Sequence, residues 1–552
     1  MILDEKIAEY KTKYTVLDVI NLDHWHDLKI YQRDPWLRDT LTTLHQEVYT
    51  NDQRILLTLS SCDNAETLLE RLQHWLFTVD ISIFFVVVLS NNPDIAQLWK
   101  SGTDTSGITF DWFHSEKYID DKDQYHVISS YNNSDLIRPT DLDDREQFLL
   151  KESKTFCIYP WIHLHTYPTG EAYPCCHAEM GIGSIGNSRK NTLGEIWNSP
   201  EQKRLRQDML SETPNPTCGR CYEQEDTGFF SGRRSANKHH GHHINRIKDT
   251  QADGHVQDFK MTYWDIRFSN LCNLSCRSCG HIFSSSWYQD QAQLAGGTWK
   301  DQNQALNYSG RTETDMWEQL IPHLDYVEQI YFAGGEPLMM KEHYNILDEL
   351  ERRGRFDVRL IYNTNFTHVK LKDRTVFDYW KRFKRVAVGA SLDAMGPRAE
   401  YIRKGTDWAV VESNRRQMLE TCPEVDFYIS PTLSIMNALH LPDFHRAWVD
   451  QGLLKPQDLN VNILQDPAYL RIDIAPAEYK AKISDKYREH IEWLRPLDPL
   501  QRATVGFESA LKFMMATDNS QLIPKFWEKT FTLDRIRKES VLDTIPELDE
   551  ME

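Results

Sequence analysis

The sequence predicts an α/β protein whose second half is built around a parallel sheet. Strand-like runs recur between residues 262 and 464, and helical patterns separate most of them. Such alternation over about 200 residues is typical of parallel sheets that curl into a barrel or partial barrel. The six runs are Thr262–Ser269, Glu328–Ala333, Asp357–Asn363, Arg385–Asp393, Val425–Leu433 and Leu459–Leu464.

Length and composition indicate several domains. The chain has 552 residues, of which 40% are apolar, so it is too long for one hydrophobic core and can fill several. The patterns along the chain divide it into five expected parts. These are a small α/β domain at 1–131, a linker at 132–149, a cysteine-bearing module at 150–250, the sheet-containing domain at 251–470 and a helical C-terminal region at 471–552.

The first 131 residues are expected to form a small α/β domain. Arg54–Leu59 and Ile81–Leu89 are strand-like apolar runs, and Ile108–Phe113 is a weaker run of the same kind. Between the first two, Ser61 and Asp63 offer N-caps to a helix with leucines on one face. This part of the sequence has no glycine-rich phosphate loop, so its role stays unassigned.

Charge and cysteine usage narrow the function classes. The formal charge is 63 − 82 = −19, so we expect the surface to repel phosphate backbones and do not expect a nucleic-acid partner. Ile81–Leu89, the longest apolar run, is too short to cross a bilayer, and no membrane partner is expected. Eight of the ten cysteines lie between residues 157 and 279, which is typical of metal ligation in a reducing cytoplasm.

Three cysteines, Cys272, Cys276 and Cys279, lie in a short loop after the first strand-like run of the repeat. Three thiolates hold three irons of a cubane cluster and leave the fourth iron open to a substrate or cofactor. The alternative is a zinc knuckle with His281 as the fourth ligand. The position of the loop favours the cubane, because strand–helix repeats carry their active sites at the carboxyl ends of the strands.

Short polar segments end the later strand-like runs. They are Ala333-Gly334-Gly335-Glu336-Pro337, Asn363-Thr364-Asn365 and Ser391-Leu392-Asp393, and Tyr401-Ile402-Arg403-Lys404-Gly405 follows. Together with the CxxxCxxC pattern at 272–279, these segments resemble the radical S-adenosylmethionine (radical SAM) superfamily. The resemblance implies a partial (β/α)6 barrel that carries a [4Fe-4S] cluster on the three cysteines of the loop.

In that superfamily the open iron is chelated by S-adenosylmethionine, and one electron from the reduced cluster releases a 5′-deoxyadenosyl radical that abstracts hydrogen from the substrate. The glycine–glutamate segment is expected to cradle the methionyl amino group, and the serine, aspartate and arginine to lie near the ribose and carboxylate. Ser278 is a departure, because the superfamily usually has an aromatic residue there, over the adenine. The cofactor-binding residues that the resemblance implies are Gly334, Gly335, Glu336, Asn365, Ser391, Asp393 and Arg403.

A second set of thiols, Cys157, Cys175, Cys218 and Cys221, is the complement for a closed cubane or for zinc. The surrounding segments, Pro168-Thr-Gly170-Glu-Ala-Tyr-Pro174-Cys175, Gly186-Asn187, Leu193-Gly-Glu-Ile-Trp197 and Cys218-Gly-Arg-Cys221, resemble the auxiliary-cluster module called SPASM, or twitch in its single-cluster form. The resemblance implies an auxiliary [4Fe-4S] cluster on these four cysteines. The module usually follows the barrel, whereas here it precedes it. Cys176 is the alternative to Cys175 as a ligand.

These resemblances predict a radical SAM enzyme with one auxiliary cluster. Enzymes with this module mostly oxidise, crosslink or epimerise peptides or proteins, so a peptide or protein substrate is expected. The alternatives are radical oxidation of a small sugar or alcohol, and a non-catalytic iron–sulfur or zinc protein that senses redox state or holds a partner. An electron donor such as flavodoxin or ferredoxin is an expected partner. Cys422 is a candidate hydrogen-atom donor, although a buried spectator thiol is the commoner role.

Overall fold

The computed structural model describes residues 142–551 apart from 179–180, 227–230, 297–303 and 499–501. Of the first 141 residues it describes four strands, β1 (Thr15–Asn21), β2 (Gln53–Thr58), β3 (Val86–Ser90) and β4 (Thr109–Trp112). They form one parallel sheet in the order β1-β2-β3-β4. Three of them fall on the runs that the sequence predicted, whereas β1 was not predicted. The helix expected between β2 and β3 lies outside the described residues.

The chain divides into two compact units, each built from more than one segment. Unit 1 consists of residues 1–164, 173–186 and 194–262, and unit 2 of residues 165–172, 187–193 and 263–552. The four cysteines of the second set belong to unit 1. The CxxxCxxC loop, the strand–helix repeat and the helical tail belong to unit 2.

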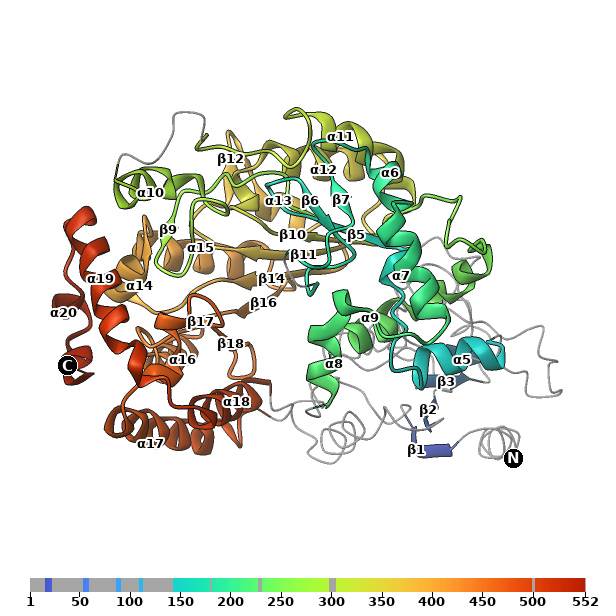
Figure 1. The fold of residues 1–552 in the computed structure, drawn as a ribbon. Coiled ribbons are helices and arrows are strands. Elements are labelled where there is room, and N and C mark those ends of the chain that lie inside the picture. The colour runs from blue at the N-terminus through green and yellow to red at the C-terminus, as the bar shows by residue number, and fades with distance from the viewer. Residues whose placement is uncertain are drawn as a thin grey trace. The chain divides into compact units, whose positions relative to one another are not determined.

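Unit 2 is organised around a parallel sheet (Figure 1). Its strands are β8 (Tyr263–Ile266), β10 (Gln329–Phe332), β11 (Arg359–Thr364), β14 (Val386–Ala390) and β16 (Asp426–Ile429), with a further parallel pair, β17 (Thr432–Leu433) and β18 (Asn462–Ile463). The order is β16-β14-β11-β10-β8, and each strand is parallel to its neighbours. Residues 165–172 and 187–193 carry parts of β5 (His163–Thr166), β6 (Glu171–Tyr173) and β7 (Gly186–Asn187), which continue this sheet. Each of the six predicted runs overlaps a strand.

Helices connect these strands, and the burial of α12 shows why they pack on the sheet. Its buried residues include His343, Ile346, Leu347 and Leu350, a spacing that places them on one face of a helix. Lys341, Asp348 and Arg352 on the other side are exposed. The helices are α10 (Tyr288–Leu294), α11 (Asp315–Leu320), α12 (Lys341–Arg352), α13 (Val376–Trp380), α14 (Gly396–Ile402), α15 (Trp408–Thr421) and α16 (Leu441–Asp450).

Aromatic side chains join the sheet to α12 and α13. Phe332 of β10 stacks on Tyr362 of β11 with ring centroids 5.0 Å apart, and Trp380 of α13 lies 5.0 Å from the same tyrosine ring. The Tyr362 hydroxyl is 2.9 Å from Nε2 of His343, which satisfies a polar group inside the core. Along β11 the residues alternate, so that Tyr362 is buried while Asn363 is exposed. One face of this strand is therefore packed and the other less covered.

Unit 1 contains the helices α5 (Asp144–Lys151), α7 (Pro200–Leu210), α8 (Gly219–Asp226) and α9 (Gly232–His240). The short helix α6 (Leu193–Trp197) begins at the boundary of the units. A hydrophobic cluster that includes Phe156, Trp161 and Leu205 forms the core. Helix α5 begins inside the stretch that was expected to be a linker. A capping box between Asp143 and Glu146 starts it, because each side chain accepts a hydrogen bond from the other residue's backbone.

The tail of unit 2 is helical, with α17 (Ala477–Leu494), α18 (Arg502–Ala516), α19 (Ile523–Arg537) and the short α20 (Val541–Thr544). Helices α17 and α18 pack together, and the rings of Tyr487 and Phe507 meet edge to face at 5.0 Å. Among the described residues, no helix combines the length and the apolar character needed to cross a bilayer.

Candidate functional site

The CxxxCxxC loop follows the carboxyl end of β8, and hydrogen bonds to its backbone hold it in place. Its two-residue strand β9 (Ser275–Cys276) pairs antiparallel with β15 (Arg403–Lys404), which places Cys276 opposite Arg403. The carbonyl of Cys276 accepts from the Cys279 amide at 3.0 Å and from the Trp287 indole at 2.8 Å. The turn between the second and third cysteines is therefore closed by hydrogen bonds.

Burial keeps the thiols of this loop in their protonated form. It raises the pKa of Cys272 and of Cys279 to about 12, and it raises the pKa of Cys276 as well. Negative charge on Cys276 would raise the pKa of both neighbours further. Because thiolates are the ligand form, the loop needs a bound cation to hold three of them. This donor set fits an iron–sulfur cluster.

The zinc alternative required His281 as a fourth ligand. The side chain of His281 instead hydrogen-bonds to Gln291, and burial lowers the pKa of its imidazole. The three thiols of the loop are the set expected of a cubane with an open iron.

Gly334 and Gly335 bring the end of β10 against the segment before the first cysteine. Both have left-handed backbone, with φ of +84° and +49°. A Cβ at Gly335 would lie 2.3 Å from the Leu271 carbonyl oxygen, and the Glu336 amide donates to that same oxygen at 2.7 Å. A Cβ at Gly334 would lie 2.7 Å from Cβ of Arg267. Only residues without side chains fit this approach.

Glu336 links the ends of two strands. Its carboxylate is fully buried and accepts hydrogen bonds from the Thr364 hydroxyl at 2.7 Å, the Asn365 amide at 2.7 Å and the Leu338 amide at 3.1 Å. Burial nevertheless raises the pKa of Glu336 to about 7. The side-chain nitrogen of Asn365 lies 4.0 Å from Sγ of Cys272. The glutamate thereby holds Asn365 close to the first cysteine.

Arg403 and Asp393 place an ion pair beside the second cysteine. Nε and Nη2 of Arg403 each donate to a carboxylate oxygen of Asp393 at 2.8 Å, and Nη1 lies 3.7 Å from Sγ of Cys276. The Thr432 amide donates to Asp393 at 2.7 Å and orients the carboxylate. The guanidinium is therefore aimed at the thiol rather than left mobile.

Ser391 lies at the carboxyl end of β14, where its hydroxyl donates to Oδ1 of the exposed Asn363 at 2.9 Å. These two side chains belong to the less covered face of the sheet. The structure thus brings the cofactor-binding residues implied by the sequence to the carboxyl ends of neighbouring strands and to β15, around the cysteine loop. They are Gly334, Gly335, Glu336, Asn365, Ser391, Asp393 and Arg403.

In unit 1 the second set of thiols comes together. Burial raises the pKa of Cys157, Cys175 and Cys221 above the ordinary value and that of Cys218 to about 12. Charge on Cys218 or Cys221 would raise the pKa of both Cys157 and Cys175, so the four lie within electrostatic reach of one another. Cys157 and Cys221 are buried and Cys175 and Cys218 are half-buried, and four such thiols fit a closed metal site. Cys176 is half-buried beside Cys175.

Arg233 of α9 is a residue of this site that sequence reasoning missed. It is buried, it pairs with Glu225, and Nη1 donates to the carbonyls of Ser153 at 2.9 Å and Phe156 at 2.8 Å. Its positive charge lowers the pKa of three thiols against the larger effect of burial. These are Cys157, Cys218 and Cys221. The only signal in the sequence was its place in a short basic stretch.

Cys422 lies away from the cysteine loop. It is a buried residue at the end of α15 and precedes β16, so it sits at the amino edge of the sheet, whereas the loop follows the carboxyl end of β8. Burial raises the pKa of its thiol to about 11. The structure therefore places the buried thiol of Cys422 at the edge of the sheet opposite to the cysteine loop.

Comparison with known proteins bears on unit 1. Residues 157–222 match the family model of SPASM, an iron–sulfur cluster-binding domain. The match begins at Cys157 and includes Cys175, Cys218 and Cys221. The expected auxiliary-cluster module is thereby confirmed.

Several solved structures resemble parts of the chain. Native anSMEcpe with bound AdoMet is 19% identical with a TM-score of 0.30, over 42% of this chain and 60% of that one. The same protein with bound AdoMet and the Cp18Cys peptide is 16% identical with a TM-score of 0.27, over 41% of this chain and 59% of that one. Streptococcus suis SuiB bound to precursor peptide SuiA is 13% identical with a TM-score of 0.29, over 60% of this chain and 68% of that one. The chain thus spans less than two thirds of the first two. No curated protein matches it.

Proposed function

We propose that this chain is a radical SAM enzyme of the SPASM subgroup and that it abstracts a hydrogen atom from a peptide or protein. The observation that carries the proposal is the convergence of Gly335, Asn365 and Arg403 on the loop of Cys272 and Cys276 at the carboxyl ends of the strands. A metal-storage or sensor site needs the thiols alone. Residues at the carboxyl ends of the strands that lie close to these thiols imply that a second ligand binds beside them.

With its cofactors bound, the site would supply a 5′-deoxyadenosyl radical from S-adenosylmethionine and a [4Fe-4S] cluster on Cys272, Cys276 and Cys279. The chain's own residues would bind these cofactors and orient them. The left-handed backbone at Gly334 and Gly335 lets the end of β10 lie against Arg267 and Leu271, next to the cysteine loop. The remaining polar residues supply charge and hydrogen bonds, as the resemblance implies, for the amino group, carboxylate and ribose. They are Glu336, Asn365, Ser391, Asp393 and Arg403.

The auxiliary cluster is proposed to lie on Cys157, Cys175, Cys218 and Cys221. A second cluster held by four thiolates has no open iron, so its role is to carry an electron. It would accept the electron that a substrate radical loses when the product is an oxidised peptide. An external donor such as flavodoxin or ferredoxin would reduce the cluster of the CxxxCxxC loop.

The peptide class is proposed because SPASM modules accompany peptide and protein modification more often than other chemistry. The less covered face of the sheet, which includes Asn363 and Ser391, offers a surface for such a substrate. A small sugar or alcohol is the alternative substrate. Incubation of the reduced enzyme with candidate peptides and with small alcohols, followed by mass spectrometry, separates the two.

The first test counts iron. After anaerobic reconstitution, about eight irons per chain are expected in the wild type and about four in a Cys272/Cys276/Cys279→Ala variant. About four irons in the wild type and none in the variant would remove the auxiliary cluster from the proposal. Tightly bound zinc without iron would overturn the enzyme assignment.

The second test measures 5′-deoxyadenosine released from S-adenosylmethionine under a strong reductant. The wild type is expected to form it without substrate, and the triple variant is not. The matched control is Cys422→Ser, whose thiol lies at the other edge of the sheet and which should retain the wild-type rate. Two intact clusters with no 5′-deoxyadenosine would favour the non-catalytic sensor.

A further inference from the structure

Arg277 is a buried cation inside the CxxxCxxC loop, between the second and third cysteines. Its Nε donates to the Tyr401 carbonyl at 3.2 Å, and its guanidinium carbon lies 3.7 Å from the centroid of the Tyr401 ring. Nη2 forms ion pairs with Asp534 and, at 2.8 Å, with Glu539. Both carboxylates come from the C-terminal tail, more than 250 residues away along the chain.

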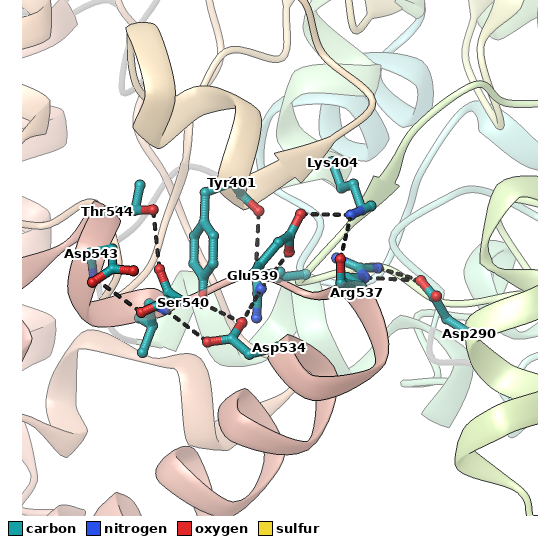
Figure 2. Close-up of polar contacts among 11 residues, drawn as sticks. Asp290, Tyr401, Lys404, Asp534, Arg537, Glu539, Ser540, Asp543 and Thr544 are labelled. Carbon is teal, nitrogen blue, oxygen red and sulfur yellow. Dashed lines mark hydrogen bonds and ion pairs between the residues drawn. The ribbon is translucent and has the colours of Figure 1, made fainter.

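Asp534 is held in place for this contact. It is a buried residue near the end of α19, and its carboxylate accepts from the Tyr401 hydroxyl at 2.8 Å and from the Val541 amide at 2.8 Å. Figure 2 shows Glu539 joined to Lys404 by an ion pair, and Asp534 on the helix below Tyr401. The tail therefore presents two ordered carboxylates to the loop.

Two further ion pairs fasten the same segment. Lys404 of β15, next to Arg403, binds Glu539 at 2.8 Å. Arg537 at the end of α19 binds Asp290 of α10 at 2.9 and 2.7 Å, as Figure 2 shows. The Arg537 guanidinium also lies 4.8 Å from the ring of Trp287, whose indole donates to the Cys276 carbonyl.

This network is closed in charge. Three cations are matched by three carboxylates, and most of these groups are largely buried. They are Arg277, Lys404 and Arg537 with Asp290, Asp534 and Glu539. A buried cation that loses its partner destabilises the folded protein. Arg277 of the loop therefore requires the carboxylates of Asp534 and Glu539 in the tail.

We propose that residues 534–539 of the tail are part of the cluster-binding site, and that Arg277 is the positioning residue through which they act. Asp534 and Glu539 fix Arg277, which fixes the turn that carries Cys276 and Cys279. The tail carboxylates also offset the positive charge next to the cluster and so set its reduction potential. This inference rests on the proposed function, since it takes the three cysteines of the loop as cluster ligands.

Asp534→Asn and Arg277→Met test the two effects separately in the full-length holoprotein. The readouts are the rate at which a chelator removes iron from the cluster, and the midpoint potential of the cluster whose EPR signal responds to S-adenosylmethionine. Iron loss is expected to be about tenfold faster in both variants, because the turn opens more often. The potential should rise in Asp534→Asn, which loses a negative charge, and fall in Arg277→Met, which loses a positive one.

The double variant Arg277→Met/Asp534→Asn should return the potential toward the wild-type value while iron loss stays fast. Arg277→Lys keeps the positive charge but loses the branched guanidinium and its contact with the Tyr401 ring. This variant should therefore lose iron faster than the wild type while the midpoint potential stays unchanged. If Asp534→Asn does not fold, Arg277→Lys still decides the positioning role.

The matched control is Glu547→Gln. Glu547 belongs to the same tail and forms a two-pronged pair with Arg398 at 2.5 and 3.0 Å, so its ion pair lies on α14 rather than on the cysteine loop. Wild-type iron loss and potential are expected in it. Equal behaviour of Asp534→Asn and Glu547→Gln would overturn the inference. If the Cys272/Cys276/Cys279→Ala variant kept all its iron, these cysteines would not be cluster ligands, and the proposed function itself would be overturned.

Discussion

Arg403 and Asp393 form a two-pronged ion pair, 2.8 Å at each contact, and the third guanidinium nitrogen lies 3.7 Å from Sγ of Cys276. The pair connects the carboxyl end of β14 to the strand that pairs with the cysteine loop. A fork of this shape is specific to arginine, because lysine offers a single point charge.

Arg403→Lys should therefore lower the rate of 5′-deoxyadenosine formation by about 10- to 100-fold, since the ammonium cannot span Asp393 and the thiol together. The measurement is the initial rate under strong reductant at saturating S-adenosylmethionine. Arg385→Lys is the control, because Arg385 binds the Asp357 carbonyl at the amino edge of the sheet. A wild-type rate in Arg403→Lys would exclude the arginine from cofactor positioning.

Gly335→Ala should weaken cofactor binding and destabilise the protein by about 1–3 kcal/mol, because left-handed backbone with a Cβ is strained. The strain is increased by the Leu271 carbonyl, which would lie 2.3 Å from the new Cβ. Gly354→Ala is matched for backbone, at φ +70°, but its Cβ would meet nothing within 4 Å. Chemical unfolding and equilibrium binding of S-adenosylmethionine compare the two. Equal losses would show that crowding at Gly335 has no role.

Cys175→Ser should remove the auxiliary cluster, whereas Cys176→Ser should keep it. The reason is that the charges of Cys157, Cys218 and Cys221 all reach Cys175. Iron content in a Cys272/Cys276/Cys279→Ala background reads this cluster alone, with about four irons expected for Cys176→Ser and none for Cys175→Ser. The reverse result would assign the ligand to Cys176.

Arg233→Met should shift the potential of the auxiliary cluster to a more negative value. A buried cation beside Cys157, Cys218 and Cys221 favours the reduced, more negative cluster, and its removal withdraws that stabilisation. An EPR-monitored redox titration measures the shift. Arg204→Met, which removes an exposed arginine of α7, is the control and should leave the potential unchanged.

The histidine pair between α16 and α17 should make stability depend on pH. Nδ1 of His445 lies 3.0 Å from Nε2 of His490, and burial lowers their pKa values to about 4 and about 2. Because the unfolded chain takes up protons near pH 6.5, this stability is fully present above that pH and is lost as the pH falls toward 4.

A His445→Asn/His490→Asn variant should therefore lose less thermal stability than the wild type when the pH is lowered from 7 to 5. The apparent melting temperature at the two pH values measures this, with His255→Asn as the control. An unchanged difference between the two pH values would mean that other groups carry the acid sensitivity.

Several elements could be predicted because their signals are local. The strands of unit 2 are short β-branched and aromatic runs between helical patterns, and each of the six predicted runs overlaps a strand. A signal for α5 was also present, since Asp143 is followed three residues later by Glu146, but the acidic composition of the stretch suggested a linker. A signal for β1 was also present, because Thr15–Asn21 is rich in β-branched and apolar residues, but this run was not recognised as a strand.

The chemistry of the site followed from residue types and spacing. Three cysteines within eight residues limit the possibilities to a few metals, and the glycine pair after a strand implies close approach. The two long-range contacts of the site, Arg233 with its thiols and Arg277 with Asp534, had no such signal. Arg277 meets Asp534, which lies 257 residues away, and Arg233 is held by the Phe156 carbonyl, which lies 77 residues away.

The amino-acid sequence alone indicated the two sets of cysteines, the strands of unit 2 and the polar residues that follow those strands, because these features depend on neighbours only a few positions apart. Which charges surround the thiols became visible only in the folded chain. Folding brings α9 against the cysteines of unit 1 and α19 against the loop of unit 2. A buried charge is tolerated only where a partner meets it, and that meeting depends on packing over hundreds of residues rather than on local pattern.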